Sequence, residues 1–247
     1  MPTVVILRHG ESTWNRENLF TGWHDVPLSE TGEIEACRAG DTLREAGLWF
    51  DVVHTSLLTR AVDTATLALA TLGQPWLPVE RSWRLNERHY GALQGLDKKA
   101  TTELHGPEQT KLWRRSYDVP PPPVAWDNPE HPAQDRRYRR LPPDVLPSTE
   151  CLKDVVARVL PYWHDVVVPQ LRAGLVPLVV AHGNSLRALV KHLEHISDAD
   201  IAELNIPTGA PRRYDLDDDL GVVSAQYLGD ADAVAAAAAA VAQQAGT

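Results

Sequence analysis

Short runs of strand-forming residues stand at wide intervals along the chain. Residues 4–7 form a β-branched apolar run that stops at Arg8, and residues 178–181 form a second run of the same kind. Continuous apolar runs are typical of parallel strands that are buried on both faces. Residues 51–56 are interpreted as a third strand. A further short extended piece is expected to begin at Val79, after two prolines.

Helical patterns separate these strands. A hydroxyl cap at Ser29 precedes a helical pattern that Gly47 closes. Residues 59–72, 149–172 and 186–195 are also helical in pattern or composition. Strands that alternate with helices indicate an α/β fold, with a mostly parallel central sheet flanked by helices on both faces.

Two regions break this alternation. Residues 91–147 are irregular and proline-rich, and we interpret them as an inserted lobe over the active site. Residues 231–245 are almost all alanine and have no amphipathic stripe. Two interpretations of this segment are possible, a mobile helix and a disordered tail. We expect one α/β domain over residues 1–230 and a separate tail over residues 231–247.

Charge and cysteine content narrow the classes of partner. The formal net charge is -9, whereas nucleic-acid binding draws on clustered Lys and Arg. No apolar run approaches the roughly 20 residues of a membrane helix. No export signal is recognisable, and Cys37 and Cys151 are too few for a disulfide framework. We therefore expect a cytoplasmic protein without nucleic-acid or membrane partners, in which a few converging arginines would bind any small anion.

Two strands are expected to end in a His-Gly pair. His9 and Gly10 follow the first strand, and His182 and Gly183 follow the run at 178–181. Ligand sites of parallel sheets lie beyond the carboxyl ends of the strands, so the two imidazoles should share one crevice. Glycine would let a ligand approach the backbone closely, and a neutral imidazole can attack phosphorus. One such pair alone is more often structural; two pairs favour chemistry.

Other chemistries fit the residues less well. A zinc site requires three or four ligands, and no third His or Cys stands suitably near these histidines in sequence. The Gly-x-Ser-x-Gly elbow of serine hydrolases and the Walker loop of ATP-binding proteins are both absent. Position alone leaves Arg60 undecided between phosphate binding and a solvated helix face. Glu87, a candidate general acid or base, is by itself more typical of an exposed charge cluster.

Several segments resemble one family of enzymes. The chain resembles the cofactor-dependent phosphoglycerate mutases of the histidine phosphatase superfamily over about residues 3–227. An Arg-His-Gly triplet alone marks only the superfamily, whereas the segment 85–95 is far more specific. The segments that carry the resemblance are 7–12, 20–23, 85–95, 113–115 and 181–187.

The resemblance implies a covalent relay. His9 would accept a phosphoryl group from 2,3-bisphosphoglycerate and pass it to 3-phosphoglycerate, and the bisphosphate would return its other phosphoryl group to leave 2-phosphoglycerate. His182 would donate a hydrogen bond to the phosphoryl oxygens, which Arg8 and Arg60 would also bind, and no metal is implied. Glu87 would act as general acid and base. Substrate or phosphate contacts are implied for Ser12, Asn15, Thr21, Gly22, Arg88, Tyr90, Lys98, Arg114, Arg115, Gly183 and Asn184.

Related functions stay open. Sister enzymes that synthesise bisphosphoglycerate tend to carry glycine where Ser12 stands, which favours the mutase of glycolysis and gluconeogenesis. A broad phosphatase would expose the phosphohistidine to water, and a non-catalytic phosphohistidine scaffold would lack a catalytic residue. Similar enzymes are often dimers or tetramers, so we expect a homodimer or homotetramer. Tails of related enzymes can cover the active site, and residues 231–247 are expected to modulate access to it.

Overall fold

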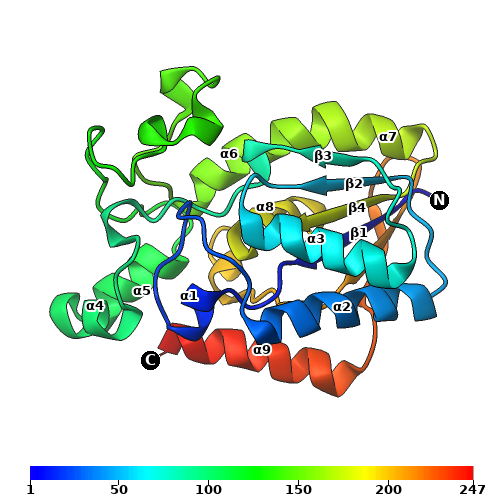
Figure 1. Ribbon diagram of the computed structural model, residues 1–247, viewed down its shortest axis with the longest axis horizontal. Coiled ribbons are helices and arrows are strands. Elements are labelled where there is room, and N and C mark those ends of the chain that lie inside the picture. The colour runs from blue at the N-terminus through cyan, green and yellow to red at the C-terminus, as the bar shows by residue number, and fades with distance from the viewer. Residues whose placement is uncertain (247) are drawn as a thin grey trace.

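One six-stranded sheet forms the centre of the molecule (Figure 1). The computed structural model describes the backbone of residues 1–246 and all their side chains except those of residues 240 and 242–246. The strands lie in the order β3-β2-β4-β1-β5-β6. Their bounds are β1 Thr3–Arg8, β2 Val52–Thr55, β3 Val79–Arg81, β4 Pro177–Ala181, β5 Arg212–Leu216 and β6 Val222–Tyr227.

The sheet is parallel in its first four positions and antiparallel at one edge. β4 pairs in parallel with both β1 and β2, and β2 pairs in parallel with β3. β5 pairs antiparallel with β1, and β6 pairs antiparallel with β5. The predicted α/β fold with a mostly parallel sheet is confirmed. The sequence did not indicate β5 and β6 because β5 opens with two arginines and β6 is largely exposed, so neither is a continuous apolar run.

Helices cover both faces of the sheet. Val5 and Leu7 pack on the face covered by α2 and α3, whereas Val4 and Ile6 pack toward α6 and α8. This alternation follows from the strand period of two residues. The helices are α1 Thr13–Arg16, α2 Glu30–Glu45, α3 Thr59–Leu72, α4 Lys98–His105, α5 Pro107–Arg115, α6 Leu152–Tyr162, α7 Val168–Arg172, α8 Gly183–Leu193 and α9 Ala231–Gly246. Short 3₁₀ turns occupy Trp83–Leu85, Gly91–Leu93, Pro132–Gln134, Arg136–Tyr138, Pro143–Val145 and Asp200–Glu203.

Residues 149–172, which have a helical pattern, form two α-helices joined by a π-helical turn rather than one α-helix. The first helix begins at Leu152, and the π-helical turn over Trp163–Val167 separates α6 from α7. Pro161 and Pro169 flank that turn, and each lacks the N–H that an α-helix needs. A wider turn accommodates such gaps and keeps the chain helical.

The inserted region contains two helices that the sequence analysis described as irregular. Gly106 separates α4 from α5 with a φ of +81°, and Pro107 begins α5. In α5 only Thr110 is buried. The apolar periodicity by which a helix is recognised is therefore missing from this segment, although the helix is present. In Figure 1 both helices lie at the end of the molecule toward which β1 runs.

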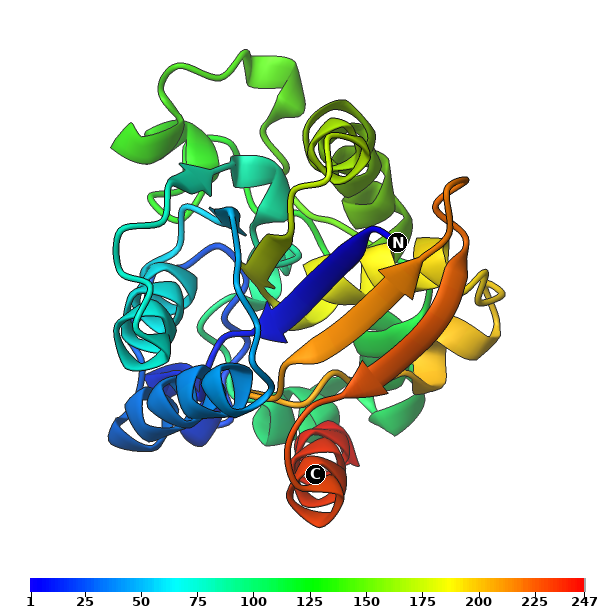
Figure 2. The same ribbon diagram turned by 90° about the vertical axis from the view of Figure 1, so that its right-hand side faces the viewer.

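The alanine-rich tail is helical over Ala231–Gly246, which is one of the two alternatives left open by its composition. Figure 2 shows α9 outside the sheet, where the chain continues beyond the edge strand β6. No helix in the described part of the chain is long and apolar enough to cross a membrane.

Candidate active site

Two histidines meet beyond the carboxyl ends of β1 and β4. The backbone N–H of His9 donates to the carbonyl of Ala181 at 3.0 Å, which ties the ends of the two strands together. The rings of His9 and His182 lie edge to face with their centroids 4.9 Å apart. The sequence analysis expected these two imidazoles to share one crevice, because each follows the end of a strand. The structure brings them together.

The His9 ring is oriented by the backbone carbonyl of Gly10. Its Nδ1 lies 2.6 Å from the carbonyl oxygen of Gly10, and a carbonyl only accepts, so Nδ1 carries the proton. The lone pair is therefore on Nε2. Burial lowers the pKa of His9 well below 6.5, and the positive charges of Arg60 and Arg8 lower it further.

Gly10 packs closely against α2. A Cβ at this position would lie 2.2 Å from the carbonyl oxygen of Gly32 in α2. The loop after β1 therefore passes directly against the first turn of α2. On the side where a Cβ would stand, Gly10 therefore contacts the protein itself, which explains why a larger residue would not fit here.

The His182 ring is oriented by a serine that the sequence analysis missed. Its Nε2 lies 2.7 Å from Oγ of Ser56, the residue after β2. Its Nδ1 is buried and has no partner among the described residues. A hydroxyl both donates and accepts, so the Ser56 contact fits either tautomer of the His182 ring. Burial lowers the pKa of His182 well below 6.5, and Arg60 and His9 add to the effect.

Two buried arginines flank the histidines. Arg8 donates from Nη1 to the carbonyl of Ile206 at 2.7 Å, and its buried Nε has no partner among the described residues. Arg60 donates to the carbonyls of Gly22 and His24 at 2.8 and 3.1 Å. Burial lowers the pKa of Arg60 to about 10, which leaves it charged at neutral pH. Carbonyl partners orient these cations without neutralising them, so both stay available to an anion.

Glu87 lies between the inserted region and α8. Its Oε1 accepts from the backbone N–H of Arg88 at 2.7 Å and from that of Asn184 at 3.1 Å. The Glu87 carbonyl accepts from the indole of Trp23 and from Arg158. The side chain is 8% exposed and lines the same cavity as His9. A carboxylate held by two backbone donors at a cavity wall has the geometry of a general acid and base.

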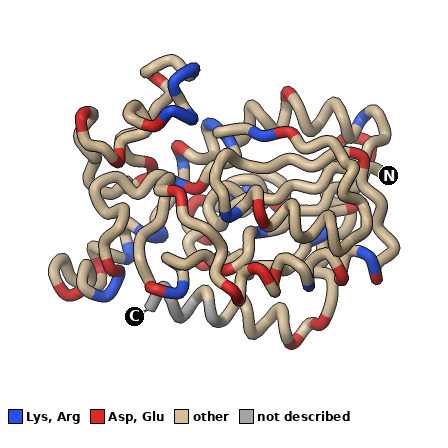
Figure 3. The backbone as a smooth tube through the Cα atoms, viewed as in Figure 1, with Lys and Arg blue, Asp and Glu red and all other residues tan. Residues whose placement is uncertain are grey.

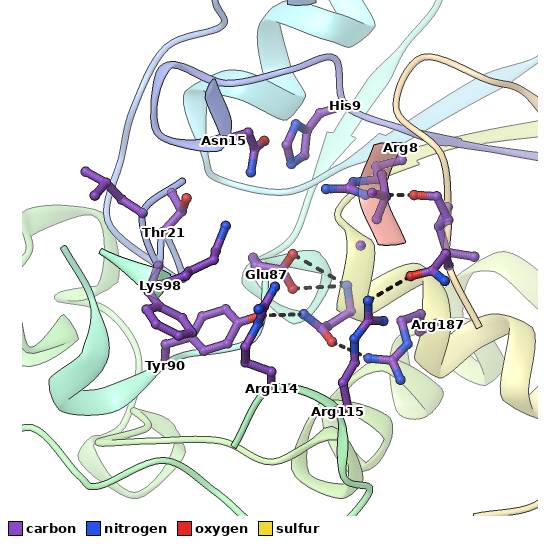
Figure 4. A pocket seen from close by; sticks show the side chains of 18 of the residues that line it. Arg8, His9, Asn15, Thr21, Glu87, Tyr90, Lys98, Arg114, Arg115 and Arg187 are labelled. Atoms are coloured by element: carbon purple, nitrogen blue, oxygen red, sulfur yellow. Dashed lines mark hydrogen bonds between the residues drawn. The ribbon is translucent and has the colours of Figure 1, made fainter. Parts of the chain in front are cut away.

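A second cationic group faces His9 across the cavity. Figure 4 shows Lys98, Arg114 and Arg115 pointing into the cavity from the side opposite His9. Burial lowers the pKa of Lys98 to about 7, with Arg114 and Arg8 contributing. Burial also lowers the pKa of Arg114 to about 10. An anion in the cavity would raise both pKa values, because it favours the charged forms.

Most of the predicted contact residues line the cavity. Ser12, Arg88 and His182 were also predicted for the site and are not among the residues that line it. Ser12 caps α1 by accepting from the backbone of Asn15 at 3.1 Å. Arg88 is fully buried under Tyr90, with its guanidinium carbon 4.4 Å from the ring centroid. The cavity is lined by Arg8, His9, Asn15, Thr21, Gly22, Arg60, Glu87, Tyr90, Lys98, Arg114, Arg115, Gly183 and Asn184 among the predicted residues.

Some lining residues were not predicted individually, among them Arg187, Asn205 and Val241. Arg187 lies one helical turn after Gly183 in α8, and this i, i+4 spacing was the signal that could have identified it. Asn205 accepts from Arg115 at 2.8 Å. Val241 reaches the cavity from α9, across a sequence distance that no local pattern bridges.

The cavity is cationic within an acidic protein. Figure 3 shows acidic and basic positions interspersed along the backbone, in keeping with the net charge of -9. Six Lys and Arg residues line the described wall of the cavity, against the single carboxylate of Glu87. Such an arrangement attracts a small polyanion. The described residues contain no group of three or more His, Cys, Asp and Glu side chains that could hold a metal ion.

Comparison with known proteins identifies the family. The sequence pattern of the histidine phosphatase superfamily (branch 1) matches residues 4–134 and 124–227. A mycobacterial glucosyl-3-phosphoglycerate phosphatase is 23% identical, with a TM-score of 0.68 over 92% of this chain and 97% of the other. The alpha-ribazole phosphatase from Shigella flexneri is 20% identical, with a TM-score of 0.66 over 92% and 96%. These two likenesses concern the fold; the match to the family pattern shows that the chain belongs to branch 1 of the histidine phosphatase superfamily.

Proposed function

We propose that this phosphoryl-transfer enzyme interconverts 3-phosphoglycerate and 2-phosphoglycerate through a phosphohistidine at His9, as a step of glycolysis and gluconeogenesis. The observation that carries the proposal is the pair of cationic groups that face one cavity. Arg8 and Arg60 flank the nucleophile, and Lys98, Arg114 and Arg115 approach from the opposite side. 3-Phosphoglycerate has a phosphate at one end and a carboxylate at the other. It can therefore bind to both cationic groups at once.

Each catalytic side chain has a defined task in this proposal. Nε2 of His9 attacks phosphorus, so that an N–P bond forms as a P–O bond breaks, and Glu87 gives a proton to the leaving oxygen. In the second half the substrate hydroxyl attacks the phosphohistidine while Glu87 takes its proton back. Arg8, Arg60 and Nδ1 of His182 stabilise the charge that spreads over the transferring phosphoryl oxygens.

The residues also fit 2,3-bisphosphoglycerate as the primer and intermediate. Arg8 Nε, His182 Nδ1 and Thr21 Oγ1 are buried polar atoms without partners among the described residues. Buried donors of this kind are costly unless a ligand satisfies them, and phosphate oxygens are strong acceptors. When bound, 2,3-bisphosphoglycerate supplies the phosphoryl group that loads His9. Lys98, Arg114 and Arg115 would hold its other phosphate.

A phosphatase is the second candidate, and a specific observation favours it. The two solved structures described above are named as phosphatases. In a phosphatase, water takes the phosphoryl group from His9 and inorganic phosphate leaves. The same His9, Arg8, Arg60 and His182 would serve either reaction, so the acceptor of the phosphoryl group is what distinguishes them.

The deciding experiment follows both products together. The protein is mixed with 3-phosphoglycerate, with and without 2,3-bisphosphoglycerate and with a chelator present, and 2-phosphoglycerate and inorganic phosphate are measured. Bisphosphate-stimulated, chelator-resistant isomerisation that exceeds phosphate release supports the mutase. Dominant phosphate release supports the phosphatase, and net accumulation of bisphosphoglycerate supports a synthase. His9→Ala abolishes turnover and the acid-labile phosphoenzyme in every enzymatic case; an unchanged biological activity of that variant would point to a scaffold.

A further inference from the structure

The carboxamide of Asn184 has two different neighbours. Its Oδ1 accepts from Nη1 of Arg187 at 2.9 Å, and its Nδ2 donates to the hydroxyl oxygen of Tyr90 at 3.3 Å. Asn184 and Arg187 lie one turn apart on α8, whereas Tyr90 belongs to the segment after Glu87. The two bonds therefore connect α8 to the segment that carries the general acid and base.

Arg187 decides which way this carboxamide faces. A guanidinium has only donors, so the atom of Asn184 that faces it must be the oxygen. The amino group then faces Tyr90 and the cavity. Because the Tyr90 oxygen already accepts that bond, its own hydrogen is free to point toward an anion. Without Arg187 the carboxamide could rotate by half a turn and present its oxygen to the cavity, where it would repel phosphate or carboxylate oxygens.

The local structure around Arg187 does not neutralise it. The residue is 5% exposed and forms no ion pair with a carboxylate of the described residues. Nη2 donates to the carbonyl of Ile201 at 2.6 Å, and the buried Nε has no partner in the described part of the chain. Burial lowers its pKa to about 9, with Arg115 and Arg88 contributing to the shift. A buried cation without a counter-ion is destabilising, so packing alone is a poor explanation for it.

We propose that Arg187 is a positioning residue, which turns the carboxamide of Asn184 so that Asn184 and Tyr90 both donate toward the anionic end of the substrate that lies away from His9. The identity of that substrate rests on the proposed function. The positioning role rests on the hydrogen bonds of Arg187, Asn184 and Tyr90. It predicts an effect on substrate binding rather than on the transfer of the phosphoryl group.

Steady-state kinetics and binding test this role. We expect Arg187→Met to raise the KM for 3-phosphoglycerate about 10- to 100-fold, the loss that follows when a hydrogen bond to a charged group is removed. The kcat should change less than about threefold, because the groups around His9 stay in place. Arg187→Lys restores a donor and should recover part of the KM. Arg172→Met is the matched control, since Arg172 is an exposed arginine on α7 and should leave both constants unchanged.

A double-mutant comparison asks whether Arg187 acts through Asn184. Asn184→Ala removes the carboxamide, so adding Arg187→Met should raise the KM no further than Asn184→Ala alone. Additive effects on KM, or a fall in kcat at unchanged KM, would overturn the proposal. Circular dichroism and thermal melting check that each variant folds. If Arg187→Met does not fold, Arg187→Lys carries the comparison, and its failure to bind substrate better than Asn184→Ala would count against the proposal.

Calorimetry separates this inference from the proposed function. Titration with 3-phosphoglycerate reports both ends of the cavity, whereas we expect inorganic phosphate to bind more tightly beside His9, between Arg8 and Arg60, than at the opposite end. Arg187→Met should weaken the binding of 3-phosphoglycerate. The affinity for inorganic phosphate should stay unchanged within about threefold, since the contacts of Arg187 lie away from His9. A wild-type protein that binds 3-phosphoglycerate but does not isomerise it would refute the mutase and still allow this comparison. Equal weakening for both ligands would refute the positioning role.

Discussion

Oγ of Ser56 lies 2.7 Å from Nε2 of His182, and the same oxygen accepts from the backbone N–H of Leu58 at 3.1 Å. A hydroxyl oxygen has a second lone pair, so the contact fits either tautomer of His182; in the proposed mechanism Ser56 donates to Nε2 and Nδ1 carries the hydrogen. Ser56→Ala frees the imidazole to change tautomer. We expect kcat to fall about 10-fold at similar KM, because one neutral hydrogen bond that positions a catalytic group is worth roughly 1 kcal/mol or slightly more.

A matched control separates this effect from the loss of the local backbone bond. Ser82 accepts from the backbone N–H of Arg84, also two residues ahead, and forms no hydrogen bond with a histidine of the described residues. Ser82→Ala should therefore lose similar stability and retain its kcat. Equal kcat losses in Ser56→Ala and Ser82→Ala, measured alongside thermal melting, would show that Ser56 acts only on stability.

Glu87→Gln tests proton transfer without removing the side chain. Its amide oxygen can still accept from the backbone of Arg88 and Asn184, but an amide neither gives nor takes the required proton. Loss of general acid-base catalysis typically costs about 10²- to 10⁴-fold, and we expect kcat to fall within that range. Rapid-quench measurement should show slower loading of His9. Glu103→Gln, an exposed change on α4, serves as the control; a kcat for Glu87→Gln equal to that of the control would exclude Glu87 from proton transfer.

The buried ion pair of Arg158 and Glu150 supports the segment that carries Glu87. Nε and Nη2 of Arg158 reach the two carboxylate oxygens at 2.6 and 3.0 Å, and Nη2 also donates to the Glu87 carbonyl. Arg158→Met leaves the Glu150 carboxylate buried and unpaired. Urea unfolding should show a loss of about 3–5 kcal/mol, as expected when one partner of a buried pair is removed. A loss below 1 kcal/mol would show that Glu150 is resolvated in the variant.

The sequence predicts those parts of the site that depend on local position. A histidine at the end of a buried strand is recognisable from the few residues around it, and His9 and His182 both follow such strands. Arg60 could be placed near the crevice because α3 begins directly after β2. Glu87 was more difficult, since a carboxylate among charged residues is usually exposed, and only the resemblance to a family assigned it a role.

Contacts between distant segments account for what the sequence could not predict. Ser56 and His182 are 126 positions apart, and nothing beside Ser56 marks it as a partner of an imidazole. Arg115 and Asn205 are 90 positions apart, and their bond depends on how α5 meets the segment after Asp200–Glu203. The helices α4 and α5 were missed because they bury few residues, so their sequences lack apolar periodicity.

Burial of a neutral histidine predicts a dependence of stability on pH. The ring of His89 is buried, its Nδ1 accepts from the backbone of Gly91, and burial with His131 and Arg158 lowers its pKa to about 3. In the unfolded chain His89 has an ordinary pKa near 6.5. As the pH falls, the unfolded protein therefore binds a proton at His89 before the folded protein does. Stability is therefore lost as pH falls below about 6.5.

The expected size follows from these two pKa values. Between pH 7 and pH 5, His89 should contribute about 2 kcal/mol to the decrease in the free energy of unfolding. Glutamine cannot be protonated. The free energy of unfolding of His89→Gln should therefore fall by about 2 kcal/mol less than that of the wild type between pH 7 and pH 5. Urea unfolding at both pH values measures the difference, and His105→Gln, at an exposed position of α4, should behave as wild type. Parallel pH profiles for wild type and His89→Gln would contradict a neutral buried His89.

The alanine-rich tail reaches the cavity at one position. Val241 of α9 lines the same cavity as His9, although α9 follows the last strand and lies outside the sheet. An apolar side chain at the cavity wall excludes water. In the proposed mechanism water competes with the hydroxyl of phosphoglycerate for the phosphoryl group on His9. Truncation after Asp230 should therefore raise the rate of phosphate release relative to isomerisation. Val241→Ala should shift the ratio in the same direction by a smaller amount, while unchanged rates in the truncated protein would exclude a role of α9 in controlling access to His9.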